Sequence, residues 1–547
     1  MVGIVSVVKP MHRVEREAAV AEAPALHRVI WYKDPGLRKL YGMAIALFFA
    51  SATTGYDGSM LNGLQILNVW QDYFHHPTGS ILGLFGSIYS IGSLAGLPFA
   101  PYLSDTFGRR IAIMVGCLFL FAGVAIQSAS QSFSMFIAGR FFVGFGNSMC
   151  SNSAPLLLTE LAHPQHRGRV TTVYNQLWDI GSIAATWITF GTFTIKNNWS
   201  WRIPSIFQAF PTLILFCTIW TIPESPRWLI SKDRHSEALA TLAKYHANGD
   251  ETDLTVQFEF REIRETLHLE FQSKRSSSYL DFFKTKGNRY RLLLVVALGL
   301  FSQWSGNGLT SYYFSLVMKS IGVTNKNEQF EINGCKTIVS LVVGLSAAAV
   351  VDKVGRRPLF LSATCDRLTH RPRAGEAVTD DSAGMFVSFV LWTACSALYD
   401  LDGNLAAGKT VIFFIFLHGA FYNIAWSGLL VGYTVEIMPY KIRAKGLMLM
   451  NFFVQVALVF NQYINPIGLD HLQPRWRFYA IYCGWLMFEL LFVAFLFVET
   501  RGVTLEEVAK IFDGEDAEVA HIDLDVVQEK VQTMATEVED ARPEHKV

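Results

Sequence analysis

The chain has 547 residues, of which 51% are hydrophobic and only 17% are charged. Soluble proteins carry about 25% charged residues, and here the charges are missing from long stretches, which is typical of a polytopic membrane protein. The formal net charge of zero gives no reason to expect a nucleic-acid partner. The seven cysteines show neither metal-ligand spacing nor a disulfide framework. We find no catalytic constellation, so we expect no enzyme, no cofactor and no metal.

Twelve apolar runs approach the length of about 20 residues that a membrane-spanning helix needs. They predict an all-α membrane protein with twelve transmembrane helices in two pseudo-symmetric six-helix bundles. The bundles would cover 40–222 and 291–498, with an N-terminal tail over 1–39, a helical linker over 223–290 and a C-terminal tail over 499–547. The predicted spans are 40–61, 80–102, 111–129, 133–153, 170–191, 203–222, 291–314, 334–351, 383–399, 410–432, 446–466 and 477–498.

The distribution of Lys and Arg predicts the orientation. Basic residues gather in the loops that hold Arg109, Arg167, Lys353 and Lys441, whereas the first loop, 62–79, has neither Lys nor Arg. Because cytoplasmic loops carry the excess of positive charge, we expect both termini and the linker on the cytoplasmic side. Without a signal peptide, the first span would itself direct insertion.

The sequence Asp-x-x-Gly-Arg-Arg occurs twice, at Asp105–Arg110 and at Asp352–Arg357, each time beside an apolar run. A charged turn at the same place in two halves indicates internal duplication, which in a membrane chain points to a transporter. Residues 365–382 do not fit this pattern, because they place many charges and a proline inside the ninth span. We interpret them as an insertion in helix 9, from retained intron sequence or a wrong gene model. The alternative is a long cytoplasmic loop before a short helix, and transcript sequencing would decide.

Five motifs occur in order beside the matching spans: Gly92-x-x-x-Gly96 with the first repeat, Gly139-Arg140-x-x-x-Gly144, Pro223–Arg227, the second repeat and Val498–Gly502. Together they resemble the sugar-porter family of the major facilitator superfamily over about residues 40–510. The resemblance implies alternating access between two bundles that move a sugar. A closer similarity to fungal lactose permeases and cellodextrin transporters rests on Phe301–Asn307, Tyr433–Ile437, Arg443–Gly446 and Phe460–Pro466.

Charged residues at the inner ends of the bundles form a candidate cytoplasmic gate. Opposite charges there can pair when the inner side is closed and separate when it opens, and each exposed pair contributes about 0–1 kcal/mol. The alternative is that these charges only set the topology. The predicted gate comprises Asp105, Arg109, Arg110, Glu160, Arg167, Glu224, Arg227, Asp352, Arg356, Arg357, Glu436, Arg443 and Glu499.

Asp57 lies inside the first span, where a charge costs about 2.5–3.5 kcal/mol on insertion scales. Arg140, near the start of the fourth span, is the expected partner. The resemblance implies that Asp57 couples transport to protons, with an incoming proton breaking the pair. The alternative is a permanent ion pair in a passive facilitator. Asp179 and Glu489 are also intramembrane; Asp179 has no assigned role, and a structural hydrogen bond is favoured for Glu489.

A neutral sugar needs amides to bind its hydroxyl groups and an aromatic ring for its C–H faces. Polar residues on several spans match or neighbour the family's pocket positions, although a single buried amide often serves only helix packing. Ser302, Gly308 and Val431 depart from the usual pocket pattern, which leaves hexose, disaccharide (lactose or cellobiose) or a less usual polyol open. The predicted substrate-binding residues are Gln176, Gln303, Asn307, Asn423, Trp426, Asn451 and Gln455.

These observations predict a plasma-membrane sugar permease, a proton symporter that functions as a monomer in the lipid bilayer. One rival is a passive facilitator. Another is a sugar sensor that binds without transporting, which the short C-terminal tail disfavours. A third is a non-functional product caused by residues 365–382.

Overall fold

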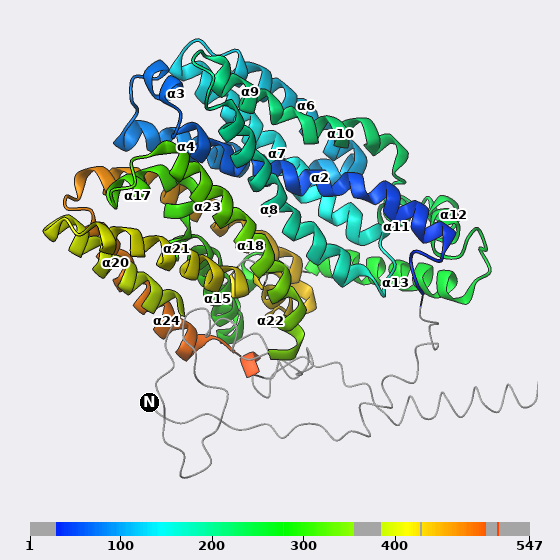
Figure 1. Ribbon diagram of the computed structural model, residues 1–547. Helices are drawn as coiled ribbons and strands as arrows, with labels where there is room; N and C mark the ends of the chain where they lie inside the picture. Colours follow the sequence, from blue (N-terminus) through cyan, green and yellow to red (C-terminus); the bar gives the residue numbers. More distant parts are fainter. Residues whose placement is uncertain (1–28, 277, 355–383, 427–428, 499–510, 514–547) are drawn as a thin grey trace, which may run out of the picture.

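The computed structural model describes residues 29–276, 278–354, 384–426, 429–498 and 511–513. Within these ranges every regular element is a helix, so the all-α prediction is confirmed. The helices of the first 222 residues gather in one group and those from residue 286 onward gather in a second group beside it (Figure 1).

The first group opens with α2 (Pro35–Leu64), whose start is set by local chemistry. Pro35 occupies the first helical position, and the Asp34 carboxylate accepts a hydrogen bond of 3.0 Å from the Leu37 amide. The remaining elements are α3 (Asn68–Tyr73), α4 (Gly79–Gly96), α5 (Phe99–Phe107), α6 (Arg109–Ser128), α7 (Phe133–Leu161), α8 (Arg167–Thr192), α9 (Trp199–Phe207), α10 (Ala209–Thr218) and the 3-10 turn η1 (Ile219–Thr221).

The polar linker is helical and lies against the first group. The Trp228 indole donates to the Asp105 carbonyl at 3.1 Å, and His246 Nε2 lies 3.1 Å from the Leu161 carbonyl. Its elements are α11 (Pro226–Ser231), α12 (His235–His246), α13 (Leu254–Ser276) and α14 (Asp281–Lys284).

The second group contains a broken helix. The predicted span over 291–314 is interrupted at Gly306, whose φ of 89° lies in the left-handed region that glycine adopts readily. Such breaks are typical of transporter helices near a binding site. The elements of this group are α15 (Lys286–Trp304), α16 (Asn307–Tyr312), α17 (Phe314–Ser320), α18 (Lys326–Val354), α20 (Gly384–Asp402), α21 (Leu405–Ala425), α22 (Leu430–Ile437), α23 (Tyr440–His471) and α24 (Trp476–Leu496).

Each of the twelve predicted spans coincides with one helix or with consecutive helices of the described ranges. By length and composition alone, seven of the described helices are apolar enough to cross a membrane, so the full count of twelve stays a prediction. The domain boundaries stay predictions as well. The proposed insertion, residues 365–382, lies outside the described residues.

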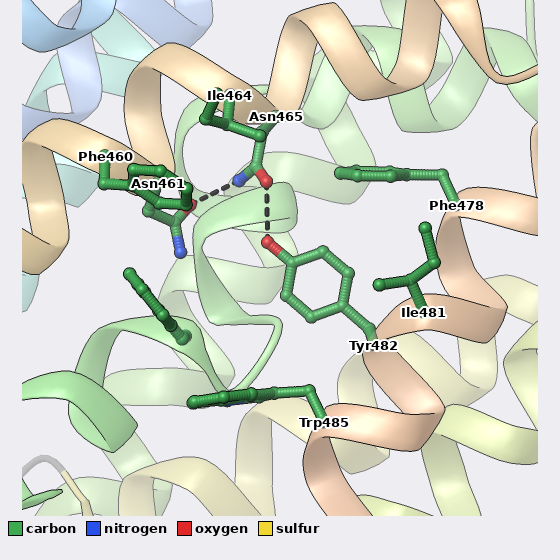
Figure 2. Close-up of a pocket in the computed structure, with 9 residues that line it drawn as sticks. Phe460, Asn461, Ile464, Asn465, Phe478, Ile481, Tyr482 and Trp485 are labelled. Atoms are coloured by element: carbon green, nitrogen blue, oxygen red, sulfur yellow. Dashed lines mark hydrogen bonds between the residues drawn. The ribbon is translucent and has the colours of Figure 1, made fainter.

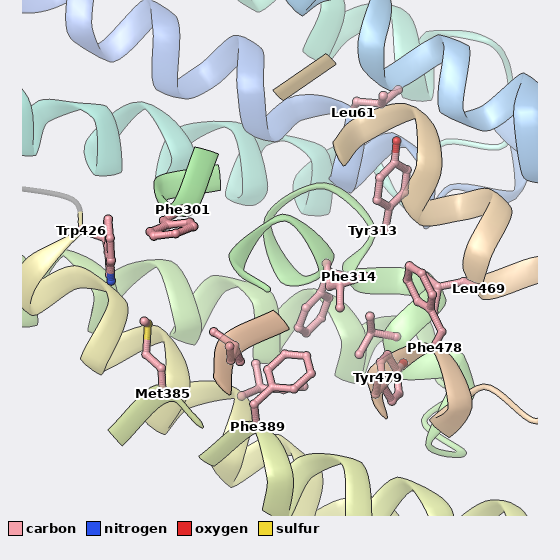
Figure 3. Close-up of a cluster of buried hydrophobic side chains, with 14 of the residues drawn as sticks. Leu61, Phe301, Tyr313, Phe314, Met385, Phe389, Trp426, Leu469, Phe478 and Tyr479 are labelled. Atoms are coloured by element: carbon pink, nitrogen blue, oxygen red, sulfur yellow. The ribbon is translucent and has the colours of Figure 1, made fainter. Parts of the chain in front are cut away.

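The two groups share apolar packing. One buried cluster includes Leu61 of α2 together with Tyr313, Phe314 and Phe389 of the second group (Figure 3). The most extensive contacts between the groups run along two helix pairs, α4 with α23 and α8 with α18, and α2 also contacts α16. The halves are therefore joined by side-chain packing as well as by the linker.

Hydrogen bonds between the halves gather at one end, beside the predicted outer loop 62–79. The Asn62 amide oxygen accepts from the Phe314 backbone at 3.0 Å, and Gln65 donates to the Tyr312 carbonyl at 2.8 Å. Nearby, Ser90 donates to Gln462 at 2.8 Å. At this end the two halves are held together.

Candidate functional site

A cavity of about 460 Å³ lies between the halves. Its wall is formed by α2, α7 and α8 on one side and by α15, α16, α18, α21, α22 and α23 on the other. Amides, hydroxyl groups and aromatic rings make up much of this wall, a mixture suited to a ligand rich in hydroxyl groups.

Most of the predicted substrate-binding residues meet in this cavity. Two do not line it: Gln455 of α23, and Gln176 of α8, whose amide lies against Gly344 of α18. Gln176 therefore serves the packing between the halves in this conformation. The predicted residues that line the cavity are Gln303, Asn307, Asn423, Trp426 and Asn451.

Sequence reasoning missed several residues of this wall. Lys336 is the most informative, because it is a cation about 10 residues into α18, roughly 15 Å along the helix. The sequence did contain a signal for Lys336, because an ionisable side chain within a predicted span is a functional candidate by default. Other wall residues that were not predicted are Asn62, Asn175, Trp178, Asn333, His418 and Tyr422.

Asp57 is fully buried within α2. Gln208, between α9 and α10, donates from Nε2 to Asp57 Oδ1 at 2.7 Å. Among the described residues, Asp57 Oδ2 has no hydrogen-bond partner. One carboxyl oxygen is therefore satisfied by a neutral amide, and the other is free to carry a proton.

The expected ion pair between Asp57 and Arg140 is not formed. The buried Arg140 guanidinium lies 5.6 Å from the centroid of the Tyr89 ring, a cation–π arrangement. Arg140 is near enough to attract Asp57 electrostatically, but no contact within 4.0 Å joins them in the part of the chain that the structure describes. The prediction of a direct pair is thus wrong for this conformation, because Gln208 and Tyr89 hold the two side chains.

Three of the predicted gate residues form one network at the N-terminus of α6, in which the side chains of Arg109 and Glu160 are buried and that of Asp105 is exposed. Arg109 binds Glu160 of α7 through two hydrogen bonds, Nε–Oε2 at 3.0 Å and Nη2–Oε1 at 3.2 Å. Its Nη1 also donates to Asp105 at 3.2 Å. The paired arginine–carboxylate geometry is the strong form of such contacts.

Glu224 reaches the same turn by a different contact. Its carboxylate accepts hydrogen bonds from the backbone amides of Arg109 and Arg110, each at 3.2 Å, at the N-terminus of α6. A helix N-terminus favours an anion there. Burial, the largest effect, raises the pKa of Glu224 above its ordinary value despite these amides.

The remaining gate predictions have mixed outcomes. Arg167 does not approach Glu160; it lies 3.9 Å from Glu259 of the linker helix α13. Arg443 donates to the Met438 carbonyl at 3.3 Å. Arg227 and Glu436 have interactions within the described structure. The side chain of Asp352 and all of Arg356, Arg357 and Glu499 lie outside the described residues.

Glu489 of α24 is fully buried. Both of its oxygens lie near Ser305 Oγ, at 3.1 and 3.0 Å, and the Ser305 carbonyl faces His418 Nε2 at 2.9 Å. The side chain thus lies in a hydrogen-bonded cluster where α15, α21 and α24 meet.

A second pocket, of about 170 Å³, lies beside α23 and α24 and is mainly aromatic (Figure 2). Asn465 donates to Asn461 there, and the Tyr482 hydroxyl donates to Asn465 at 2.6 Å. Asn461 also donates to the Gln303 carbonyl. These amides join helices and lie outside the central cavity.

Comparison with known proteins agrees with this architecture. The high-affinity glucose transporter of Kluyveromyces lactis is 26% identical over 88% of this chain and 86% of its own. The quinate permease of Neurospora africana is 28% identical over 87% of this chain and 89% of its own. The structure of the proton:xylose symporter XylE of E. coli, bound to 6-bromo-6-deoxy-D-glucose, has a TM-score of 0.68 at 20% identity. It covers 87% of this chain and 99% of that one.

The family model described as "Sugar (and other) transporter" matches residues 43–512. That match spans both helix groups, the linker and every described residue of the central cavity. The chain therefore belongs to this transporter family, within the major facilitator superfamily, and is a multi-pass membrane protein.

Proposed function

We propose that this protein is a plasma-membrane sugar permease that couples uptake to protons through Asp57. The observation that carries the proposal is the arrangement of Asp57, which is buried, bonded on one oxygen by the neutral Gln208 and without a partner on the other. Proteins similar to this chain include a high-affinity glucose transporter and a proton:xylose symporter. A hexose or a disaccharide remains open as substrate.

The coupling would work through two arrangements of the same side chains. In the arrangement seen here Gln208 donates to Asp57 and Arg140 lies over Tyr89, and we assign this arrangement to the protonated, neutral form of Asp57. An ionised Asp57 would attract Arg140, which lies within electrostatic range. Loading or losing a proton would therefore move α2 relative to α7 and bias the equilibrium between the two open states.

The orientation in the membrane and the position of the gate are inferred from the distribution of charged residues. The loops that hold Arg109, Arg110 and Arg167 lie at the same end as the linker, which supports cytoplasmic termini by the positive-inside rule. In this orientation the hydrogen bonds of Asn62 and Gln65 close the outer side. The network of Arg109 with Glu160 would lie at the cytoplasmic gate.

Uptake into proteoliposomes tests the coupling. A gradient of one pH unit, acidic outside, supplies about 1.4 kcal/mol per proton, so one-to-one symport accumulates sugar about tenfold. Asp57→Asn should equilibrate sugar without accumulating it and should still exchange sugar. Asp72→Asn, at an exposed carboxylate outside the cavity, is the matched control and should accumulate normally.

The alternatives give different results. Wild-type sugar uptake that does not depend on the pH gradient would identify a passive facilitator. Accumulation by Asp57→Asn would remove Asp57 from the mechanism. Sugar binding by purified protein without any flux would identify a sensor.

A further inference from the structure

Two opposite charges face the central cavity from opposite halves. Asp179 lies on α8 of the first group and Lys336 lies on α18 of the second, and both line the cavity. No contact within 4.0 Å pairs them among the described residues, and they attract each other only at longer range. A neutral sugar offers neither of them an opposite charge, and charges at membrane depth are costly unless they serve a function.

Two contacts hold the Lys336 side chain in place. Its ammonium donates to the Thr310 carbonyl at 2.6 Å and lies 5.6 Å from the centroid of the Phe314 ring. A lysine ammonium has three N–H donors, and the described contacts use one of them. Because contacts within the protein already fix the Lys336 side chain, it loses little additional conformational freedom when a ligand binds to it.

The surroundings of Lys336 suit a ligand with hydroxyl groups. Asn307 lines the same cavity, and its side-chain oxygen has no hydrogen-bond partner among the described atoms. Asn333, one turn before Lys336, donates to Thr186 at 3.3 Å across the interface between the halves. Amides and a cation therefore face the same space.

We propose that the preferred substrate class is a polyhydroxylated carboxylate, a sugar acid or a cyclic polyol acid, whose carboxylate binds Lys336. This deepens the proposed function and rests on it. Lys336, not Asp179, is assigned as the anchor because it is fixed by contacts on two sides, whereas the described structure shows no hydrogen bond to Asp179. Asp179 balances the positive charge while the cavity is empty, and the carboxylate takes over that role on binding.

The test compares three compounds that share one ring: D-glucuronate, D-glucose and D-glucosamine. Purified full-length protein is titrated calorimetrically with each at constant ionic strength, and uptake is measured in proteoliposomes. Because charge-assisted hydrogen bonds are roughly twice as strong as neutral ones, glucuronate should bind at least about tenfold more tightly than glucose. Lys336→Gln should abolish that preference, so that the ratio of the two binding constants falls to about one. Lys319→Gln, at an exposed lysine outside the cavity, is the matched control and should keep it.

Asp179→Asn keeps the proposal testable if Lys336→Gln does not fold. Removing the competing carboxylate should tighten glucuronate binding several-fold relative to glucose binding. Tighter binding of glucosamine than of glucuronate, or an equal loss of all three ligands in Lys336→Gln, would overturn the assignment. If glucose is transported and glucuronate neither binds nor competes, this inference alone fails. If neither these three compounds nor lactose and cellobiose are taken up, the proposed sugar transport fails as well.

Discussion

The helices α2 and α8 lie very close together, and this close packing depends on two glycines. A Cβ atom added to Gly55 would lie 1.9 Å from the carbonyl oxygen of Trp178, and one added to Gly181 would lie 1.9 Å from that of Ala52. Ordinary contact begins at 3.4 Å, so each methyl group would force the backbones apart by about 1.5 Å. Neither obstacle is a flexible side chain, and helix interfaces in membranes rely on small residues for this reason.

We therefore expect Gly55→Ala and Gly181→Ala each to lower the free energy of unfolding by about 1–3 kcal/mol, the usual cost of overpacking. Gly42→Ala on α2 and Gly191→Ala on α8 are matched controls, because an added Cβ meets nothing within 4 Å there. These controls should be neutral or up to about 1 kcal/mol more stable, since alanine favours a helix over glycine. Unfolding of the purified variants in mixed micelles, followed by tryptophan fluorescence, gives the values. Equal stability of the contact variants and their controls would refute this account of the interface.

Further predictions concern the polar end of the first group. His246 lies 2.7 Å from Glu259, and although burial lowers its pKa, this carboxylate raises it above the ordinary value. The stability it contributes is present below the unfolded pKa of about 6.5 and is lost as pH rises through the raised pKa; His246→Gln should remove this loss in thermal unfolding between pH 6 and 9. Burial lowers the pKa of His163 to about 4, so stability should fall as pH drops from about 6.5 toward 4, and a flat profile in the wild type would contradict this. Arg109→Gln should cost about 3–5 kcal/mol because it leaves the buried Glu160 unpaired, and adding Glu160→Gln should restore part of that loss; an additive double variant would contradict the pairing.

The sequence predicted the helical architecture well, for a physical reason. Apolar runs in a membrane chain are helices because every backbone group must be satisfied within its own segment. The runs around α2, α6 and α7 therefore located helices, although they placed the helix ends less well. The break at Gly306 was not predicted, because a glycine in an apolar run does not reveal its φ angle.

The site was predicted in part. Gln303, Asn307 and Asn423 were assigned to the pocket through the family resemblance, and they line the cavity. The partner of Asp57 was wrong because pairing depends on how α2, α7 and the α9–α10 junction pack, which no local pattern encodes. Lys336 was overlooked because it falls near the edge of its predicted span, where a lysine ordinarily extends to the membrane surface.

The contacts that close one end of the molecule have a consequence for how it responds to its medium. The bonds from Asn62, Gln65 and Ser90 join uncharged groups, and each contributes about 0.5–1.5 kcal/mol. Dissolved ions screen charges and leave neutral dipoles almost untouched. The strength of these three contacts should therefore stay nearly constant from dilute to saline surroundings. Any effect of salt on the opening of this end would act through its charged groups, such as Lys326 of α18, which donates to Asn68 of α3.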